Sequence, residues 1–210
     1  MLKCLAAVCA LGLSQVNALS SFVKLDIGQG IFSTELKLGA ALGSNVDKLT
    51  SQKLSGSVSV GAVETIDQNI FIGLLAGAGY NQAQSSLQNV SYNYLGNVVS
   101  RAQTITLKET AHAGIILGVV SSAGVELYVL PKYTMAKVDV DVQSLGLSKL
   151  TQKGWGIEAG LIAAVSDSIS MGLSYSMSSL GKNSWTHAGD ILATEMYDLN
   201  NVSLTTVVSF

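Results

Sequence analysis

Alternation of apolar and polar residues with a period of two dominates the chain beyond its first eighteen residues. Successive side chains of a β-strand point to opposite faces of the sheet, so this alternation predicts strands with one apolar face. Seven such segments lie at 53–64, 69–80, 104–120, 125–138, 153–165, 168–178 and 197–210. An eighth comes from 22–32 or from 34–43, and pairing of both would make ten strands. We predict eight, beginning with 22–32, because an even number returns both termini to one rim.

The connections between these segments alternate between short and long. Short turns fall at 64–69, 121–124 and 166–168, and long polar stretches at 33–52, 81–103, 139–152 and 180–193. Two unlike rims are typical of a transmembrane β-barrel. We therefore predict an all-β, membrane-spanning, up-and-down antiparallel β-barrel with four long loops on one side. Pro131 lacks an N–H group, so we expect a bulge or the upper end of its strand there.

Composition agrees with this architecture. Of 210 residues, 48% are hydrophobic and only 12% are charged. Even so, no apolar run after residue 18 approaches the ~20 residues of a membrane helix. The net charge is −2 and the lysines are scattered singly, which argues against nucleic acid as a partner. Many residues opposite the apolar rows are glycine or serine, which suit the inside of a narrow barrel.

The first eighteen residues resemble a secretory signal peptide. They read MLKCLAAVCALGLSQVNA, with a basic start, a short apolar stretch and a Val16-x-Ala18 cleavage pattern. We expect residues 19–210 to form a single barrel domain after cleavage. Cys4 and Cys9 both lie in this leader, so the mature chain is expected to have no disulfide and no cysteine metal site.

Five charged residues fall on rows opposite the large apolar side chains: Lys24, Asp26, Glu126, Lys132 and Glu158. If the apolar rows face lipid, these charges face the lumen. A buried charge is tolerated when it is paired. The pattern therefore predicts an interior charge network.

Aromatic residues gather at the ends of the outward rows. Tyr80, Tyr133, Trp155 and Tyr175 lie towards the long-loop ends, and Phe210 lies at the other end, with Phe22 as a further candidate. Aromatic side chains at both ends predict two interfacial girdles. The alternative interpretation is that they are ordinary strand aromatics.

The chain offers little catalytic chemistry. His112 and His187 are its only histidines, and we expect them to lie far apart. A Ser–His pair with a supporting carboxylate is not apparent in the sequence. We predict no catalytic residue, no cofactor and no metal site, and hence a protein that is not an enzyme.

Three segments resemble small bacterial outer-membrane β-barrel proteins, the Opa/OmpA-type surface antigens also called porin-family or opacity proteins. They are FVKLDIGQG at 22–30, GWGIEAGLIAAVSDSISMGLSYSMSSLG at 154–181, and the C-terminal row that ends at Phe210. The resemblance implies an outer-membrane location with membrane lipid as a partner. It also implies that the barrel-assembly machinery recognises the row formed by Val202, Leu204, Val208 and Phe210.

The same resemblance implies a structural and surface-interaction role, antigen- or adhesin-like, in which the four long loops meet host or environmental ligands. A narrow pore for small solutes is the main alternative. A lipid-modifying barrel enzyme and a soluble periplasmic barrel are further alternatives.

Overall fold

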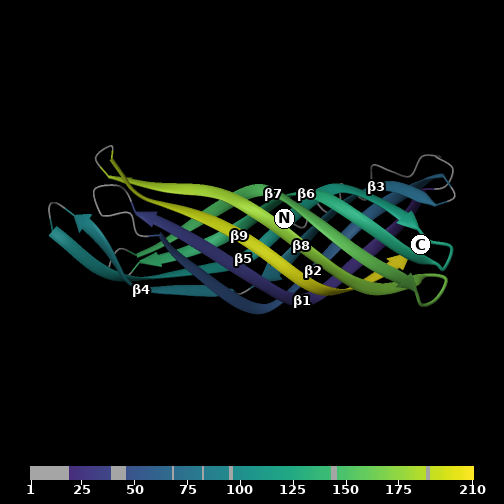
Figure 1. Ribbon diagram of the computed structural model, residues 1–210, viewed down its shortest axis with the longest axis horizontal. Helices are drawn as coiled ribbons and strands as arrows, with labels where there is room; N and C mark the ends of the chain where they lie inside the picture. The colour runs from purple at the N-terminus through teal and green to yellow at the C-terminus, as the bar shows by residue number, and fades with distance from the viewer. Residues whose placement is uncertain are drawn as a thin grey trace.

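The computed structural model describes residues 19–38, 46–67, 69–81, 83–94, 97–142, 146–187 and 190–210, so the expected leader at 1–18 lies outside the described residues. The strands run obliquely along the long axis of a barrel, and the C-terminus lies near one end (Figure 1). The strands are β1 (Leu19–Leu38), β2 (Val46–Asp67), β3 (Ile70–Asn81), β4 (Gln84–Tyr94), β5 (Asn97–Val120), β6 (Val125–Val142), β7 (Gly146–Ala164), β8 (Ile169–His187) and β9 (Asp190–Ser209). No helix among the described residues is long and apolar enough to cross a membrane.

The strands close into a ring of eight. They pair antiparallel in the order β3-β2-β1-β9-β8-β7-β6-β5-β4, and an additional β3–β5 pairing closes the sheet. β3 and β4 are successive parts of one barrel strand, because both pair with β5. The prediction of eight antiparallel strands is confirmed. The ten-strand alternative is wrong, because residues 34–38 continue β1 instead of forming a separate strand.

The register of the ring sets the tilt of its strands. Paired residues lead from Leu25 through β2, β3 and β5 to Met135 on β6. Following paired residues from Leu25 in the other direction, through β9, β8 and β7, leads to Val125, which also lies on β6. Residues 125 and 135 are ten positions apart, which is the stagger of the closed sheet. Strands of such barrels tilt by roughly 35–45°, so each residue advances about 2.3–2.7 Å along the barrel axis.

Large apolar side chains cover the outside of the ring. On β8 the outward row is 40–62% exposed, and it consists of Ile169, Met171, Leu173, Tyr175 and Met177. The outward row that begins at Trp155 on β7 ends at Val165, just beyond that strand. These ten steps correspond to about 23–27 Å along the axis, which matches the ~25 Å apolar band of outer-membrane barrels. A soluble barrel would bury such residues, so this apolar belt argues against the soluble periplasmic alternative.

The four long connections are mostly extended hairpins. Pairing of β1 with β2 continues up to Lys37–Val46, and pairing of β6 with β7 continues up to Val142–Gly146. The β4–β5 and β8–β9 hairpins likewise pair up to Tyr94–Asn97 and His187–Asp190. The expectation of loops at 33–52, 81–103, 139–152 and 180–193 is therefore wrong for most of these residues.

The hairpins stay in the sheet because they enclose apolar side chains. These side chains form an upper interior cluster: Phe32, Ala83, Ile105, Leu107, Ala136, Val138, Val140, Leu180, Tyr197 and Leu199. Removing this much apolar surface from water favours a barrel that remains closed beyond the belt. The barrel is consequently elongated along its axis (Figure 1).

Two local expectations are wrong. Pro131 lies in the middle of β6 with no register shift beside it, and its exposed ring faces outward. Direct pairs with β5 are interrupted there instead, because proline has no N–H group to donate. Phe22 does not join the lower girdle. It is 6% exposed inside the barrel, since it shares the inward row of Lys24.

Candidate functional site

The interior of the barrel is built in three layers from the short-turn end to the hairpin end. A lower apolar cluster comprises Phe22, Phe71, Leu75, Ile116, Tyr128, Leu130 and Ile162. A polar layer follows, and the upper cluster lies beyond it. The inward row of β6 passes through all three layers. Leu130 belongs to the lower cluster, Lys132 and Thr134 to the polar layer, and Ala136 and Val138 to the upper cluster.

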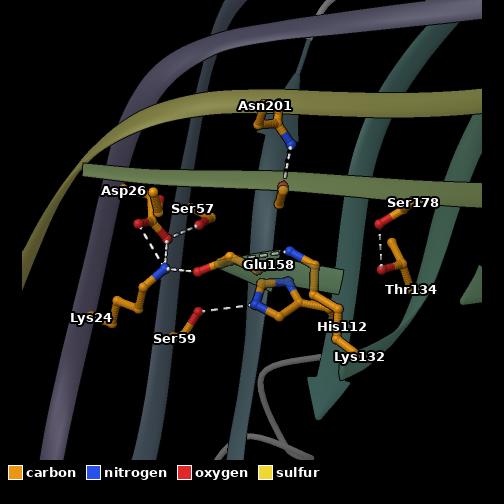
Figure 2. Close-up of polar contacts among 12 residues, drawn as sticks. Lys24, Asp26, Ser57, Ser59, His112, Lys132, Thr134, Glu158, Ser178 and Asn201 are labelled. Atoms are coloured by element: carbon orange, nitrogen blue, oxygen red, sulfur yellow. Dashed lines mark hydrogen bonds and ion pairs between the residues drawn. The ribbon is translucent and has the colours of Figure 1, made fainter. Parts of the chain in front are cut away.

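Four charged side chains meet in the polar layer (Figure 2). Lys24 Nζ lies 2.7 Å from the Asp26 carboxylate and 2.6 Å from Glu158 Oε1. Lys132 Nζ lies 2.8 Å from Glu158 Oε2. All four residues are at most 7% exposed. Two lysines and two carboxylates cancel in charge, which offsets much of the cost of removing them from water.

Neutral hydroxyl groups complete the network. Tyr128 donates a hydrogen bond to Glu158 Oε1 at 2.9 Å. Ser57 donates to Asp26 Oδ2 at 2.9 Å, and Thr205 donates to Asp26 Oδ1 at 2.7 Å. The network thus joins β1, β2, β6, β7 and β9 across the lumen, including strands that are not neighbours in the sheet. Its arrangement fits a cross-brace that fixes the barrel interior.

Glu126 stands apart from the other predicted network residues. It lies on the inward row of β6 near the short-turn end, where it is partly exposed, and it pairs in register with Ile162 and Val120. Tyr128 and Leu130 separate it along the strand from Lys132. It forms no ion pair with another described residue. The prediction of a five-residue network is therefore wrong at this position.

A serine–histidine contact inside the barrel was not apparent in the sequence. Ser59 Oγ and His112 Nε2 lie 3.1 Å apart (Figure 2). Ser59 is only 1% exposed, and no described carboxylate hydrogen-bonds to the second ring nitrogen of His112. The side chain of His187 lies outside the described part. Among the described residues, no group of three or more His, Cys, Asp or Glu side chains is placed to hold a metal ion.

A small polar cavity adjoins the charge network. Its volume is about 50 Å³, and its lining includes Asp26, Thr134, Ser176, Asn81 and Asn201. Asn81 Nδ2 and Asn201 Oδ1 are buried without a hydrogen-bond partner among the described residues. A space of this size accommodates roughly three water molecules. Buried apolar side chains occupy the lumen on both sides of this layer.

The predicted girdle residues lie on the outer face. Tyr80, Trp155 and Tyr175 are 52%, 71% and 48% exposed, and Phe210 is 77% exposed at the opposite edge of the belt. Tyr133 packs edge-to-face against Trp155, with ring centroids 5.2 Å apart. In a membrane the Tyr133–Trp155 pair would lie at the level of the lipid headgroups. Tyr175 pairs in register with Ala159 and therefore lies deeper within the apolar belt, away from the girdle.

The C-terminal row also faces outward. Val202 and Leu204 are 52% and 51% exposed, whereas Val208 is partly buried. β9 pairs with β1 and β8 and so closes the barrel. The backbone N–H of Phe210 donates to Ser21 O at 2.9 Å, which holds the last residue against β1. Recognition of this row by the assembly machinery stays a prediction.

The sequence did not identify the partners of the network. Tyr128, Ser57 and Thr205 all lie on rows that the alternation places inside, but nothing in the alternation singles them out. Lys24 and Glu158 are 134 residues apart in the chain. The signal in the sequence that could have indicated these partners is a hydroxyl side chain on an inward row, close to a predicted interior charge.

The closed eight-stranded ring, its apolar exterior and its polar interior layer define the protein as a bacterial outer-membrane β-barrel by fold. No protein-family model matches the chain, and no curated protein sequence matches it. Among solved structures, Neisserial surface protein A is similar, with 14% identity, 92% of this chain and 100% of that chain covered, and a TM-score of 0.51. The outer-membrane protease OmpT of Escherichia coli is also similar, with 10% identity, 95% and 99% coverage, and a TM-score of 0.55. At these identities the similarity concerns the fold alone.

Proposed function

We propose that this protein is a structural outer-membrane barrel that holds rigid β-hairpins above the membrane to bind molecules outside the cell. The observation that carries this proposal is strand length. β5 has 24 residues and β2 has 22. About 9–11 residues suffice for a strand to cross the membrane, so roughly half of each strand is available beyond the belt. The longer rim of such barrels faces the cell exterior.

The packing of the upper cluster supports a rigid display. Phe32 and Tyr197 are fully buried and stack with their ring centroids 6.0 Å apart and 9° between their planes. A packed core beneath the hairpins limits their motion. A preorganised surface loses less conformational entropy on binding than a flexible loop, which favours an antigen- or adhesin-like role for host or environmental ligands.

The filled lumen favours a plug over a pore. Eight-stranded barrels generally enclose side chains and no aqueous channel. Here two apolar clusters flank the charge network. The small polar cavity is the observation that favours the alternative, a narrow pore for small solutes. In planar bilayers the refolded protein is expected to give no steady conductance, and a reproducible open level would favour the pore.

Catalysis is not part of the proposal. Ser59 and His112 are in contact, but they lie within the polar layer, flanked by the two apolar clusters and away from the lipid-facing surface. A lipid-modifying enzyme needs its nucleophile at the membrane surface, where the acyl chains are. A lipid A modification assay is expected to detect no product.

Hairpin shortening tests the binding role. In the variant, each hairpin is cut back to the upper cluster; in the β1–β2 hairpin the pairs from Glu35–Lys48 outward are replaced by a short turn. Cells carrying either chain are then compared for attachment to a panel of immobilised matrix proteins and acidic polysaccharides. We expect attachment with the full chain and its loss with the shortened chain. Equal attachment by cells without the protein would refute the proposal, and heat-modifiable gel migration verifies that both barrels fold.

A further inference from the structure

An apolar groove crosses the outer face of the barrel within the membrane belt. Its volume is about 820 Å³. Its lining includes Val129, Ala159, Leu161, Leu173, Tyr175 and Val202 on β6 to β9, and it continues across β5 and β3 to Ile66 on β2. Ala159, a small residue, lies in register between Val129 and Tyr175, and all three line the groove. A groove with this lining accommodates an acyl chain, since both surfaces are apolar.

Two exposed lysines stand on β7 and β8, on the hairpin side of this groove. Lys153 lies two residues before Trp155 on the outward row of β7, and therefore closer to the hairpin end. Lys182 reaches the same face because of a bulge. The β8–β9 register shifts between Ser179 and Lys182, and Gly181 in the bulge has a φ of +84°. Strict alternation from the buried Leu180 would have placed Lys182 inside the barrel. The bulge re-aims this side chain outward.

The two strands hold these lysines near one another. An added Cβ on Gly181 would lie 3.0 Å from Lys153 O, so the backbones of β7 and β8 are adjacent at this point. Neither lysine forms an ion pair with another described residue. Asp198 on β9 faces Ser179 of β8 in register, and Glu109 on β5 is already paired with Lys137 at 2.7 Å.

The spacing along β7 matches one leaflet of a membrane. Ala159 lies near the middle of the outward apolar row, and Lys153 lies six residues further towards the hairpins. Six residues correspond to about 14–16 Å along the barrel axis. Half of the ~30 Å hydrocarbon core is about 15 Å. When the groove lies at mid-membrane, the lysines therefore lie at headgroup level, beside the Tyr133–Trp155 ring pair.

We propose that this surface is a binding site for a phosphorylated lipid of the leaflet on the hairpin side. An acyl chain occupies the groove, and Lys153 and Lys182 contact the phosphate. Lysine acts as a point charge towards phosphate, so two neighbouring lysines suit a headgroup that carries one or two such groups. The site is separate from the hairpins and does not depend on the proposed binding function.

Quenching of Trp155 fluorescence tests this site directly. The chain has two tryptophans, so Trp185→Phe leaves Trp155 as the only one. The refolded variant is placed in phosphatidylcholine vesicles that contain either brominated phosphatidic acid or brominated phosphatidylcholine. We expect stronger quenching by the phosphatidic acid at equal mole fraction, and a smaller difference at high salt because exposed charges are screened.

Matched variants separate the two parts of the site. Lys153→Gln and Lys182→Gln are each expected to reduce the preference for phosphatidic acid roughly fivefold. Lys53→Gln, at an exposed lysine on the inward row of β2 that does not face the lipid, is expected to leave the preference unchanged. Ala159→Leu fills the groove and should weaken the preference, whereas Ala113→Leu, on the outer face of β5 and outside the groove lining, should not.

Three outcomes would count against the proposal. One is equal quenching by both brominated lipids in the chain with native lysines, a result that needs no lysine variant to fold. The second is a preference that the double Lys153→Gln/Lys182→Gln variant retains. Competition by inorganic phosphate as effective as that by phosphatidic acid would also count against a lipid, because the groove would then contribute nothing.

Discussion

Replacement of Glu158 by glutamine tests whether the buried charges stabilise the barrel. The Glu158 carboxylate is 4% exposed and accepts hydrogen bonds from Lys24, Lys132 and Tyr128 at 2.6, 2.8 and 2.9 Å. Glutamine keeps the size of the side chain but removes its charge. Lys24 retains Asp26 as a partner, whereas Lys132 loses its only carboxylate among the described residues.

The expected cost follows from that unpaired lysine. Removing one partner of a buried ion pair typically destabilises a protein by about 3–5 kcal/mol, because the remaining charge is left without compensation. With a urea m value of about 2 kcal/mol/M, the unfolding midpoint should fall by about 1.5–2.5 M. The double variant Lys132→Gln/Glu158→Gln restores neutrality and should recover most of the loss.

An exposed ion pair of the same length provides the control. Lys137 Nζ lies 2.7 Å from Glu109 Oε2, and both side chains are 52% exposed. Water solvates each of these charges when the other is removed, so Glu109→Gln should barely move the midpoint. The assay is urea unfolding of refolded protein in detergent micelles, followed by tryptophan fluorescence and by gel mobility without boiling.

Two results would refute the reasoning. If Glu158→Gln moves the midpoint no further than Glu109→Gln, burial does not strengthen these pairs. If the double variant is as unstable as Glu158→Gln, the loss does not come from the unpaired lysine.

Two further predictions concern the closing strand and its seam with β1. Deletion of Phe210 removes an outward aromatic and its N–H bond to Ser21 O, and should lower the heat-modifiable fraction in the outer membrane; unchanged insertion would contradict this. Gly28→Ala puts a Cβ 1.9 Å from the backbone Val202 O and should cost about 1–3 kcal/mol. A Cβ added at Gly56 would lie 3.6 Å from its nearest neighbour, the backbone Asp26 O, which is an ordinary contact. The unfolding temperature measured by gel shift should therefore fall for Gly28→Ala but not for Gly56→Ala.

The alternation of the sequence predicted which face each strand residue occupies. It places Lys24 and Glu158 inside and Trp155 outside, and the described structure has the same orientation. This information is local, because the pleat of a strand turns successive side chains to opposite faces regardless of what the strand pairs with. The same pattern identified eight strands and the short-turn rim.

Strand length was not predictable in this way. Phe32, Val138 and Tyr197 lie in stretches rich in polar residues, so each stretch on its own resembles a loop. Only when the strands surround a common interior do these isolated side chains meet as one cluster. Burial in that cluster keeps the hairpins in the sheet, and it depends on all the strands together.

The sequence by itself therefore determined the strands, their faces and the apolar belt, because these follow from the geometry of a single strand. Only the tertiary structure decided which inward residues meet, because contact depends on register between strands distant in the chain. Ser59 and His112 are 53 residues apart, and Lys24 and Glu158 are 134 apart. It also decided that Lys182 faces outward, because one additional residue at the Gly181 bulge inverts the alternation.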